Sequence, residues 1–187
     1  DDLAEVIGDT RTGLFRAKNL ESTMDNLLLW SLLEETGARM AFSNGWRYGA
    51  PIQPGPITQG DLWNIIPVNP PVSTCTLTGA ELRKMLEENL EHTFAHDPWN
   101  QMGGYVKRSL GFQCYFKAES PRDARIEELF VDGRHVRDED EFEVAFVTTQ
   151  GVPEKYGSDR EDRDTPAIDA LHSYIAGHTP VEAPERG

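Results

Sequence analysis

The sequence predicts an α+β domain in which helices pack on a mixed sheet. Segments with helical spacing of apolar residues alternate with short strand-like runs, and the second half contains a hairpin signal, which requires antiparallel pairing. The chain has 187 residues, of which 38% are hydrophobic, and this suits one domain with its own core. We therefore expect a single domain over residues 1–187, with a frayed tail at 179–187.

The first predicted helix covers residues 21–36. Its apolar residues recur at helical spacing and cover most of the circumference, so the helix should be buried on more than one side. Gly37 should end it, because glycine adopts the left-handed backbone that terminates many helices. A short strand at 39–43 and a loop rich in glycine and proline at 44–56 should follow.

Two capping signals predict the next two helices. Thr58 with Asp61 resembles a capping box and should begin a short helix, and Thr78 with Glu81 is a full Thr-x-x-Glu box. The helix after the second box carries apolar residues at positions i, i+3, i+4 and i+8, which predicts one buried face. Residues 72–77, between the two helices, are expected to form a strand.

The second half of the chain is predicted to consist mainly of strands. Asp132-Gly133 suits a type I′ turn, and the charged segment 154–164 is expected to be an exposed loop. Thr165-Pro166 should cap and begin the last helix, which Gly177 should end. The predicted strands are 110–117, 126–131, 134–136 and 142–148.

The acidic charge excludes some partners. Lys and Arg number 18 against 32 Asp and Glu, and the formal charge of −14 repels nucleic-acid polymers and anionic membranes. No apolar run approaches the roughly 18 to 20 residues that span a bilayer. The chain starts at Asp1-Asp2-Leu3 without a signal peptide, so we expect that a leader or a preceding domain has been removed.

Metal and nucleophile signals are weak. Cys75 and Cys114 lie in apolar runs and are expected to be buried free thiols. Glu88, His92 and His96 would line one face of a continuous helix, which can hold zinc; the alternative is two histidines placed favourably at a helix C-terminus. No nucleophile or nucleotide-binding motif is present. We therefore predict no catalytic residue, no metal ligand and no cofactor in this chain.

Two loops carry the composition of a binding site. The first holds Asn44, Trp46 and Arg47, which offer an amide, a ring and a bidentate cation for an anionic or aromatic ligand. The second runs from Gln101 to Arg108, where paired glycines allow close backbone approach and two basic residues add positive charge. An ordinary polar turn is the alternative interpretation of each loop.

Together with their neighbours, these loops resemble the C-terminal domain of the 5′-nucleotidase family. The resemblance runs through nearly the whole chain, and the order and spacing of the matching segments carry it. Those segments are Glu21-Ser22-Thr23-Met24-Asp25-Asn26-Leu27, Ala41-Phe42-Ser43-Asn44-Gly45, Gly55-Pro56-Ile57-Thr58 with Asp61-Leu62, and Leu77-Thr78-Gly79-Ala80-Glu81-Leu82 with Leu86-Glu87.

The resemblance implies one half of a two-domain hydrolase acting in nucleotide catabolism. An N-terminal metallophosphoesterase domain of the same polypeptide would hold two divalent metal ions that activate water. The present chain would shape the pocket for a small phosphorylated or sulfated substrate, and alone it should be inactive. Family habit implies an extracytoplasmic location, periplasmic or secreted.

The resemblance also implies a set of substrate-binding residues. Asn44 and Arg47 would capture the anion together with Arg108, while Trp46 and Tyr105 would contact the organic part of the substrate. Two further residues, Asn69 and Gly104, complete the set. The two rings between which the family stacks a nucleobase have no counterpart in Pro67-Val68-Asn69-Pro70 or in Thr148-Thr149-Gln150-Gly151.

Two alternatives remain open. Asp97-Pro98-Trp99-Asn100-Gln101-Met102-Gly103-Gly104 and Val106-Lys107-Arg108 are similar to the thiosulfohydrolase of the bacterial Sox sulfur-oxidation system, which shares the two-domain architecture. The second alternative is a non-enzymatic binding module of the same fold. Metal-ligand motifs upstream in the reading frame would favour an enzyme, and their absence would favour the module.

Overall fold

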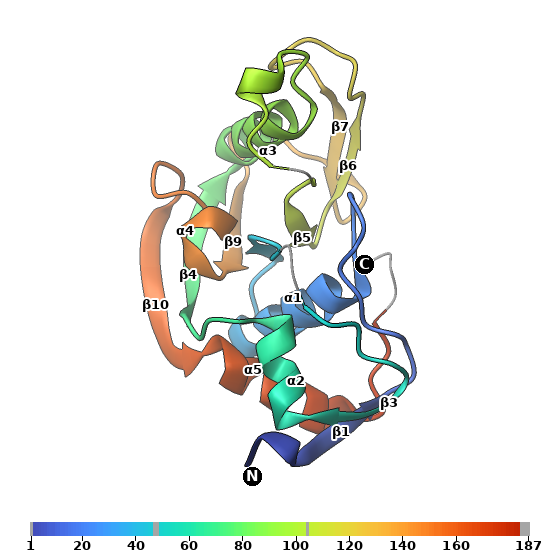
Figure 1. Ribbon diagram of the computed structural model, residues 1–187. Helices are drawn as coiled ribbons and strands as arrows, with labels where there is room; N and C mark the ends of the chain where they lie inside the picture. Colours follow the sequence, from blue (N-terminus) through green and yellow to red (C-terminus); the bar gives the residue numbers. More distant parts are fainter. Residues whose placement is uncertain (1, 47–48, 104, 184–187) are drawn as a thin grey trace.

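The centre of the fold is a five-stranded sheet with the strand order β10-β4-β9-β2-β5 (Figure 1). It is seen in a computed structural model that describes residues 2–46, 49–103 and 105–183. β2 and β9 run parallel and the other neighbours run antiparallel, so the predicted mixed sheet is confirmed. The strands are β2 (Met40–Ser43), β4 (Pro71–Thr78), β5 (Arg108–Leu110), β9 (Glu141–Phe146) and β10 (Ser158–Pro166).

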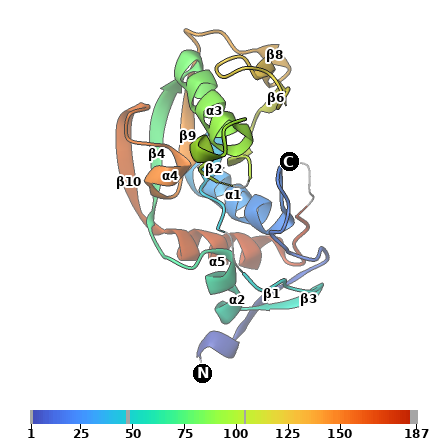
Figure 2. The same cartoon turned by 45° about the horizontal axis from the view of Figure 1, so that its top comes forward.

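Two hydrophobic cores lie on the two faces of this sheet. In β9, Val144 and Phe146 belong to one core and Ala145 to the other, because successive side chains of a strand point to opposite faces. In Figures 1 and 2, α1 (Thr23–Thr36) and α5 (Ala167–His178) lie on one side, and α3 (Gly79–Phe94) lies on the other with a three-stranded sheet. That sheet consists of β6 (Gln113–Phe116), β7 (Ile126–Val131) and β8 (Arg134–His135).

A smaller sheet lies beside the core that contains Ala145. It pairs β1 (Val6–Thr10) with β3 (Gly55–Thr58), and α2 (Gln59–Ile65) follows β3 directly. The remaining elements are the single turns η1 (Asp2–Ala4) and η2 (Pro98–Asn100) and the short helix α4 (Thr148–Gly151).

The helix signals predicted for α1, α2 and α3 are confirmed. Ser22 caps α1 by accepting a hydrogen bond from the backbone N–H of Asp25, and Gly37 ends the helix with a φ of 70°. Both capping boxes form, because Thr58 pairs with Asp61 at α2 and Thr78 with Glu81 at α3. α1 is buried on several sides, as its wide apolar surface predicts.

The hairpin between β7 and β8 is also confirmed. Asp132 and Gly133 have φ values of 50° and 72°, and positive φ at both central residues is the mark of a type I′ turn.

Both cysteines are free: Cys75 is buried and Cys114 is partly buried. Burial raises the pKa of each thiol to about 11, which keeps the thiols protonated and unreactive near neutral pH.

The sequence predicts that the charged segment 154–164 is an exposed loop, and this prediction is wrong for most of the segment. Residues from Ser158 onward form β10, an edge strand that pairs antiparallel with β4. An edge strand needs few apolar side chains, because its backbone gains hydrogen bonds on one side while most of its side chains stay in solvent. Ser73 on β4 donates a hydrogen bond of 2.6 Å to Asp162, which ties the charged strand to its neighbour.

The other corrections concern element ends. The predicted strand 110–117 is split at Gly111, whose φ is 99°, and the strand 142–148 ends at Phe146. Helix α5 begins at Ala167 without a side-chain cap from Thr165 and continues past Gly177 to His178. It ends there because Thr179 precedes a proline, and a residue in that position disfavours helical backbone.

The predicted frayed tail is wrong for residues 179–183, and residues 184–187 lie outside the described part of the chain. Val181 exchanges backbone hydrogen bonds of 2.8 and 2.9 Å with Asp9 and Arg11, and both Val181 and Ala183 are buried. This short segment is buried because it pairs with β1. The sequence does not indicate that pairing, because β1 lies at the other end of the chain. In the part of the chain that the structure describes, none of the helices combines the length and the apolar composition that a membrane span requires.

Candidate functional site

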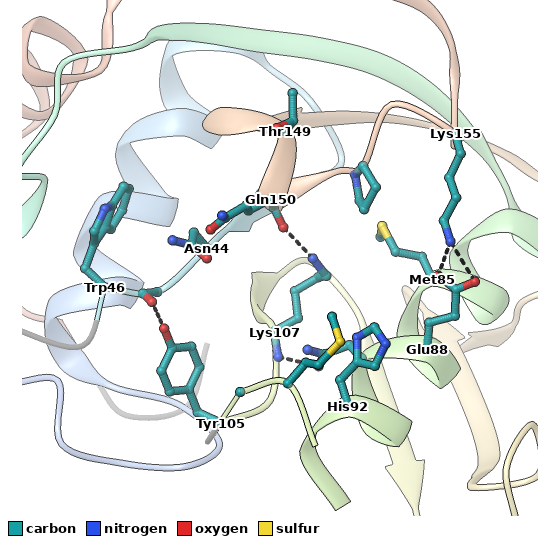
Figure 3. A pocket seen from close by; sticks show the side chains of 15 residues that line it. Asn44, Trp46, Met85, Glu88, His92, Tyr105, Lys107, Thr149, Gln150 and Lys155 are labelled. Atoms are coloured by element: carbon teal, nitrogen blue, oxygen red, sulfur yellow. Dashed lines mark hydrogen bonds and ion pairs between the residues drawn. The ribbon is translucent and has the colours of Figure 1, made fainter. Parts of the chain in front are cut away.

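A groove of about 770 Å³ opens where β2 and β9 end (Figure 3). These strands are parallel neighbours, so their carboxyl ends reach the same edge of the sheet. The loop after β2 and the α4 turn after β9 therefore lie close together, although about 100 residues separate them. The lining side chains include Asn44, Trp46, Met85, Glu88, His92, Met102, Tyr105, Lys107, Thr149, Gln150 and Lys155.

Three of the predicted substrate-binding residues come together in this groove. Asn44 and Trp46 enter from the loop after β2, and Tyr105 enters from the segment before β5. The Tyr105 hydroxyl donates a hydrogen bond to the carbonyl of Gly45, which joins the two loops. Arg47 and Gly104, which were predicted with them, lie outside the described residues.

Arg108 does not line the groove, contrary to the prediction. The residue is 2% exposed, and its guanidinium forms a 2.9 Å ion pair with Asp25 and donates hydrogen bonds to backbone carbonyls of residues 16–20. Asp25 is fully buried and also pairs with Arg16 at 2.8 Å. Arg108 is therefore held in a buried polar network and is not free to bind a substrate anion.

Asn69 is also placed elsewhere. Its side-chain oxygen accepts a hydrogen bond of 2.9 Å from the backbone N–H of Ile168, in the first turn of α5. The first N–H groups of a helix lack acceptors within the helix, and Asn69 supplies an acceptor for one of them from a distant loop. This explains how α5 starts without a local cap, and it gives Asn69 a structural role outside the groove.

Lys107 is a groove residue that the predicted set leaves out. Its ammonium donates hydrogen bonds of 2.7 Å to the carbonyl of Gln150 and 2.9 Å to that of Gly151. Burial lowers the pKa of this ammonium from 10.5 to about 8. Successive side chains of an extended chain point in opposite directions, and this could have identified Lys107 as a groove residue. Because Lys107 and Arg108 are adjacent, Lys107 points toward the groove when Arg108 points inward.

The other charges of the groove are balanced against each other. Lys155 forms a 2.7 Å ion pair with Glu88 across the end of the groove. Burial would raise the pKa of Glu88, but hydrogen bonds from Lys155 and Tyr156 and the charge of Lys155 outweigh it and hold the pKa below its usual value.

The histidine pair does not form a metal site on one helix face. α3 ends at Phe94, so Glu88 and His92 lie on the helix and line the groove, while His96 follows it. Within residues 2–46, 49–103 and 105–183, no group of three or more His, Cys, Asp or Glu side chains is arranged to hold a metal ion.

The turn that holds Lys107 is strained. Thr148 begins α4 with a φ of 61°, which is unfavourable for a β-branched residue, and its buried hydroxyl oxygen has no hydrogen-bond partner. A side chain at Gly151 would lie 3.1 Å from the carbonyl oxygen of Phe42, so this turn also packs closely on β2. Such strain persists where the surrounding structure fixes it, and it is common at binding sites.

The lowered pKa of Lys107 predicts a pH-dependent stability difference. Between about 8 and 10.5 the unfolded chain binds the Lys107 proton and the folded chain does not, so this residue makes stability rise with pH. We expect the free energy of unfolding of the wild type, relative to Lys107→Met, to rise by roughly 1 to 3 kcal/mol across this window. Urea unfolding at several pH values measures the difference, and a constant difference would contradict the lowered pKa of Lys107.

Comparison with known proteins supplies a family and relatives for this geometry. Residues 6–150 match the family described as "5'-nucleotidase, C-terminal domain". The trifunctional nucleotide phosphoesterase protein YfkN of Bacillus subtilis is 26% identical over 114 residues, which make up 61% of this chain and 7% of that protein.

Two solved structures share the fold. The 5′-nucleotidase precursor of Thermus thermophilus superposes with a TM-score of 0.80 at 22% identity, covering 98% of this chain and 38% of that one. The sulfate thiohydrolase SoxB of Thermus thermophilus superposes with a TM-score of 0.86 at 24% identity, covering 100% of this chain and 35% of that one. The present chain thus spans well under half the length of these relatives, and the similarity confirms the predicted α+β fold.

Proposed function

The chain belongs to the 5′-nucleotidase C-terminal domain family, and on that basis we propose that it is the substrate-binding domain of a two-domain hydrolase that cleaves phosphate esters, nucleotides among them. The groove is the observation that carries this proposal. It gathers an amide, two rings and an ammonium from loops that are distant in sequence: Asn44, Trp46, Tyr105 and Lys107. These groups suit recognition of an organic phosphate by hydrogen bonds, ring contact and charge.

The hydrolytic step belongs to a domain outside this chain. Two divalent metal ions held by an N-terminal metallophosphoesterase domain would supply the activated water. The described residues of the present chain offer no ligand group for those ions. Its own residues would bind the organic part of the ester, orient it and exclude water around it, and the 187-residue chain alone would be inactive.

Asn44 gives the most direct test of the groove. In the full-length hydrolase we expect Asn44→Ala to raise KM roughly 3- to 10-fold with little change in kcat, because about one hydrogen bond to the substrate is lost. The assay follows release of phosphate from nucleoside monophosphates and of sulfate from thiosulfonate-type substrates. The result expected to accompany it is that the isolated chain turns over none of these compounds.

Asn100→Ala is the matched control for this experiment. Asn100 is an exposed residue of η2 that does not line the groove, so its removal should leave KM unchanged. Equal KM values for wild type and Asn44→Ala, with every active substrate, would rule out this groove as the substrate site.

A sulfate ester is the second candidate substrate. The turn after β9 carries Thr148-Thr149-Gln150-Gly151, without the ring with which the family stacks a nucleobase, and this favours a substrate other than an ordinary nucleotide. Preferential release of sulfate in the same assay would support this alternative. A domain of this fold that docks a partner without catalysis would release neither product in the full-length protein.

Location outside the cytoplasm is part of the proposal. It is supported by the description of the Thermus thermophilus relative as a precursor. Fractionation of the source cells, with an antibody against this chain, tests it; recovery in the cytoplasmic fraction would contradict it.

A further inference from the structure

Lys107 brings a positive charge into the groove, and no carboxylate among the described lining residues pairs with it. Among the described lining residues, Lys155 is paired with Glu88, whereas Lys107 contacts the carbonyl oxygens of Gln150 and Gly151. A carbonyl oxygen carries a partial charge, so these contacts orient the ammonium without neutralising it. In a chain with a formal charge of −14, the described charges of this groove leave an excess of one positive charge.

The ammonium also keeps a donor for a ligand. A lysine ammonium has three N–H donors, and two of them are used by the carbonyls of Gln150 and Gly151. Figure 3 shows the Lys107 amine between Asn44 and Gln150 on one side and Met85 and His92 on the other. The third donor is therefore available within the groove.

The position of this amine is fixed before any ligand binds. The backbone N–H of Lys107 donates a hydrogen bond of 2.6 Å to the side-chain oxygen of Asn89 on α3. The acceptor turn at the other end of the side chain packs closely on β2, since a β-carbon at Gly151 would lie only 3.1 Å from the carbonyl oxygen of Phe42. A preorganised cation loses little conformational entropy on binding, so its charge can contribute to affinity.

We propose that Lys107 is a specificity-determining residue that selects esters whose organic part carries a negative charge of its own. The inference rests on the proposed function: the scissile phosphate or sulfate would be bound by the metal ions of the N-terminal domain. The unbalanced ammonium in this groove then serves a second anion on the leaving group, such as a carboxylate or another phosphate.

Two matched pairs of esters test this specificity in the full-length hydrolase. The first pair is phenyl phosphate and 4-carboxyphenyl phosphate, and the second is adenosine 5′-monophosphate and adenosine 3′,5′-bisphosphate. The wild type should prefer the more charged member. Lys107→Met should reduce that preference, measured as the ratio of kcat/KM values, by about 10- to 100-fold in at least one pair. Lys107→Arg should retain most of it.

Lys117→Met is the matched control, because it removes the same charge from an exposed lysine that pairs with Glu127 outside the groove. It should leave both ratios unchanged. If Lys107→Met changes neither ratio, or lowers kcat/KM equally for both members of each pair, the residue has no role in specificity. If the wild-type hydrolase cleaves none of the four esters, the proposed function itself fails and the inference fails with it.

Discussion

Asp25→Ala should destabilise the protein by about 3 to 5 kcal/mol, the loss expected when one partner of a buried ion pair is removed. Asp25 is fully buried, and its two carboxylate oxygens pair with Arg16 at 2.8 Å and Arg108 at 2.9 Å. The substitution leaves the buried Arg108 guanidinium without a carboxylate partner, and it also removes the acceptor of the Ser22 hydroxyl. Urea unfolding monitored by circular dichroism measures the loss.

Glu127→Ala is the control for this substitution. It also removes one carboxylate that pairs with a cation, but Glu127 and Lys117 lie on the surface, where such pairs contribute at most about 1 kcal/mol. Asp25→Asn, which keeps the shape of the side chain, should behave like Asp25→Ala if charge is the cause. Losses of similar size for Asp25→Ala and Glu127→Ala would contradict the buried network.

Gly111→Ala should cost about 2 to 5 kcal/mol, as the sum of a strained backbone and a steric conflict. Gly111 has a φ of 99°, a region that alanine rarely adopts. A β-carbon at this position would lie 2.3 Å from the carbonyl oxygen of Arg39 and 2.9 Å from the Cα of Met40. Both contacts are with backbone at the start of β2, which cannot move without disturbing the central sheet. The free energy of unfolding, again from urea titration, gives the cost.

Gly133→Ala separates the two contributions. Gly133 has a similarly positive φ of 72°, but no atom lies within 4 Å of the position that its β-carbon would take. This substitution should therefore cost only the backbone preference, about 1 to 2 kcal/mol. If Gly111→Ala costs no more than Gly133→Ala, the contact between the β5–β6 junction and β2 is less close than described.

The buried network that Asp25 organises also supports the candidate site. The Arg16 guanidinium lies 5.8 Å from the centre of the Trp46 ring, and that of Arg108 lies 4.7 Å from the centre of the Tyr105 ring. Cation–π contacts of this kind hold a ring in place. Arg108, predicted to bind substrate directly, instead supports a side chain that lines the groove.

Prediction of the fold succeeded where the signal is local. The capping boxes at Thr58 and Thr78, the helix end at Gly37 and the Asp132-Gly133 turn each depend on residues within four positions of one another, and each is present. The edge strand β10 was missed because its pairing with β4 joins residues more than 80 positions apart and leaves no apolar pattern.

The groove follows the same division. Asn44, Trp46 and Tyr105 belong to loops that the sequence marks by composition and by family motif, and the structure brings them together. Lys107 could not be distinguished from Arg108 without the strand pairing that decides which of them points inward. The distant cap that Asn69 provides for α5 likewise has no local sign.

The sequence alone determined the α+β class, most helices and their caps, the hairpin turn and the family. These features depend on hydrogen bonds between residues close in sequence and on the order of motifs, and both can be recognised in the sequence. Only the tertiary structure decided the partners of the charged groups. Arg108 is buried in the network of Asp25, and Lys107 reaches the carbonyls of the α4 turn. Such pairings depend on which distant segments the sheet places side by side, and charge by itself does not specify its partner.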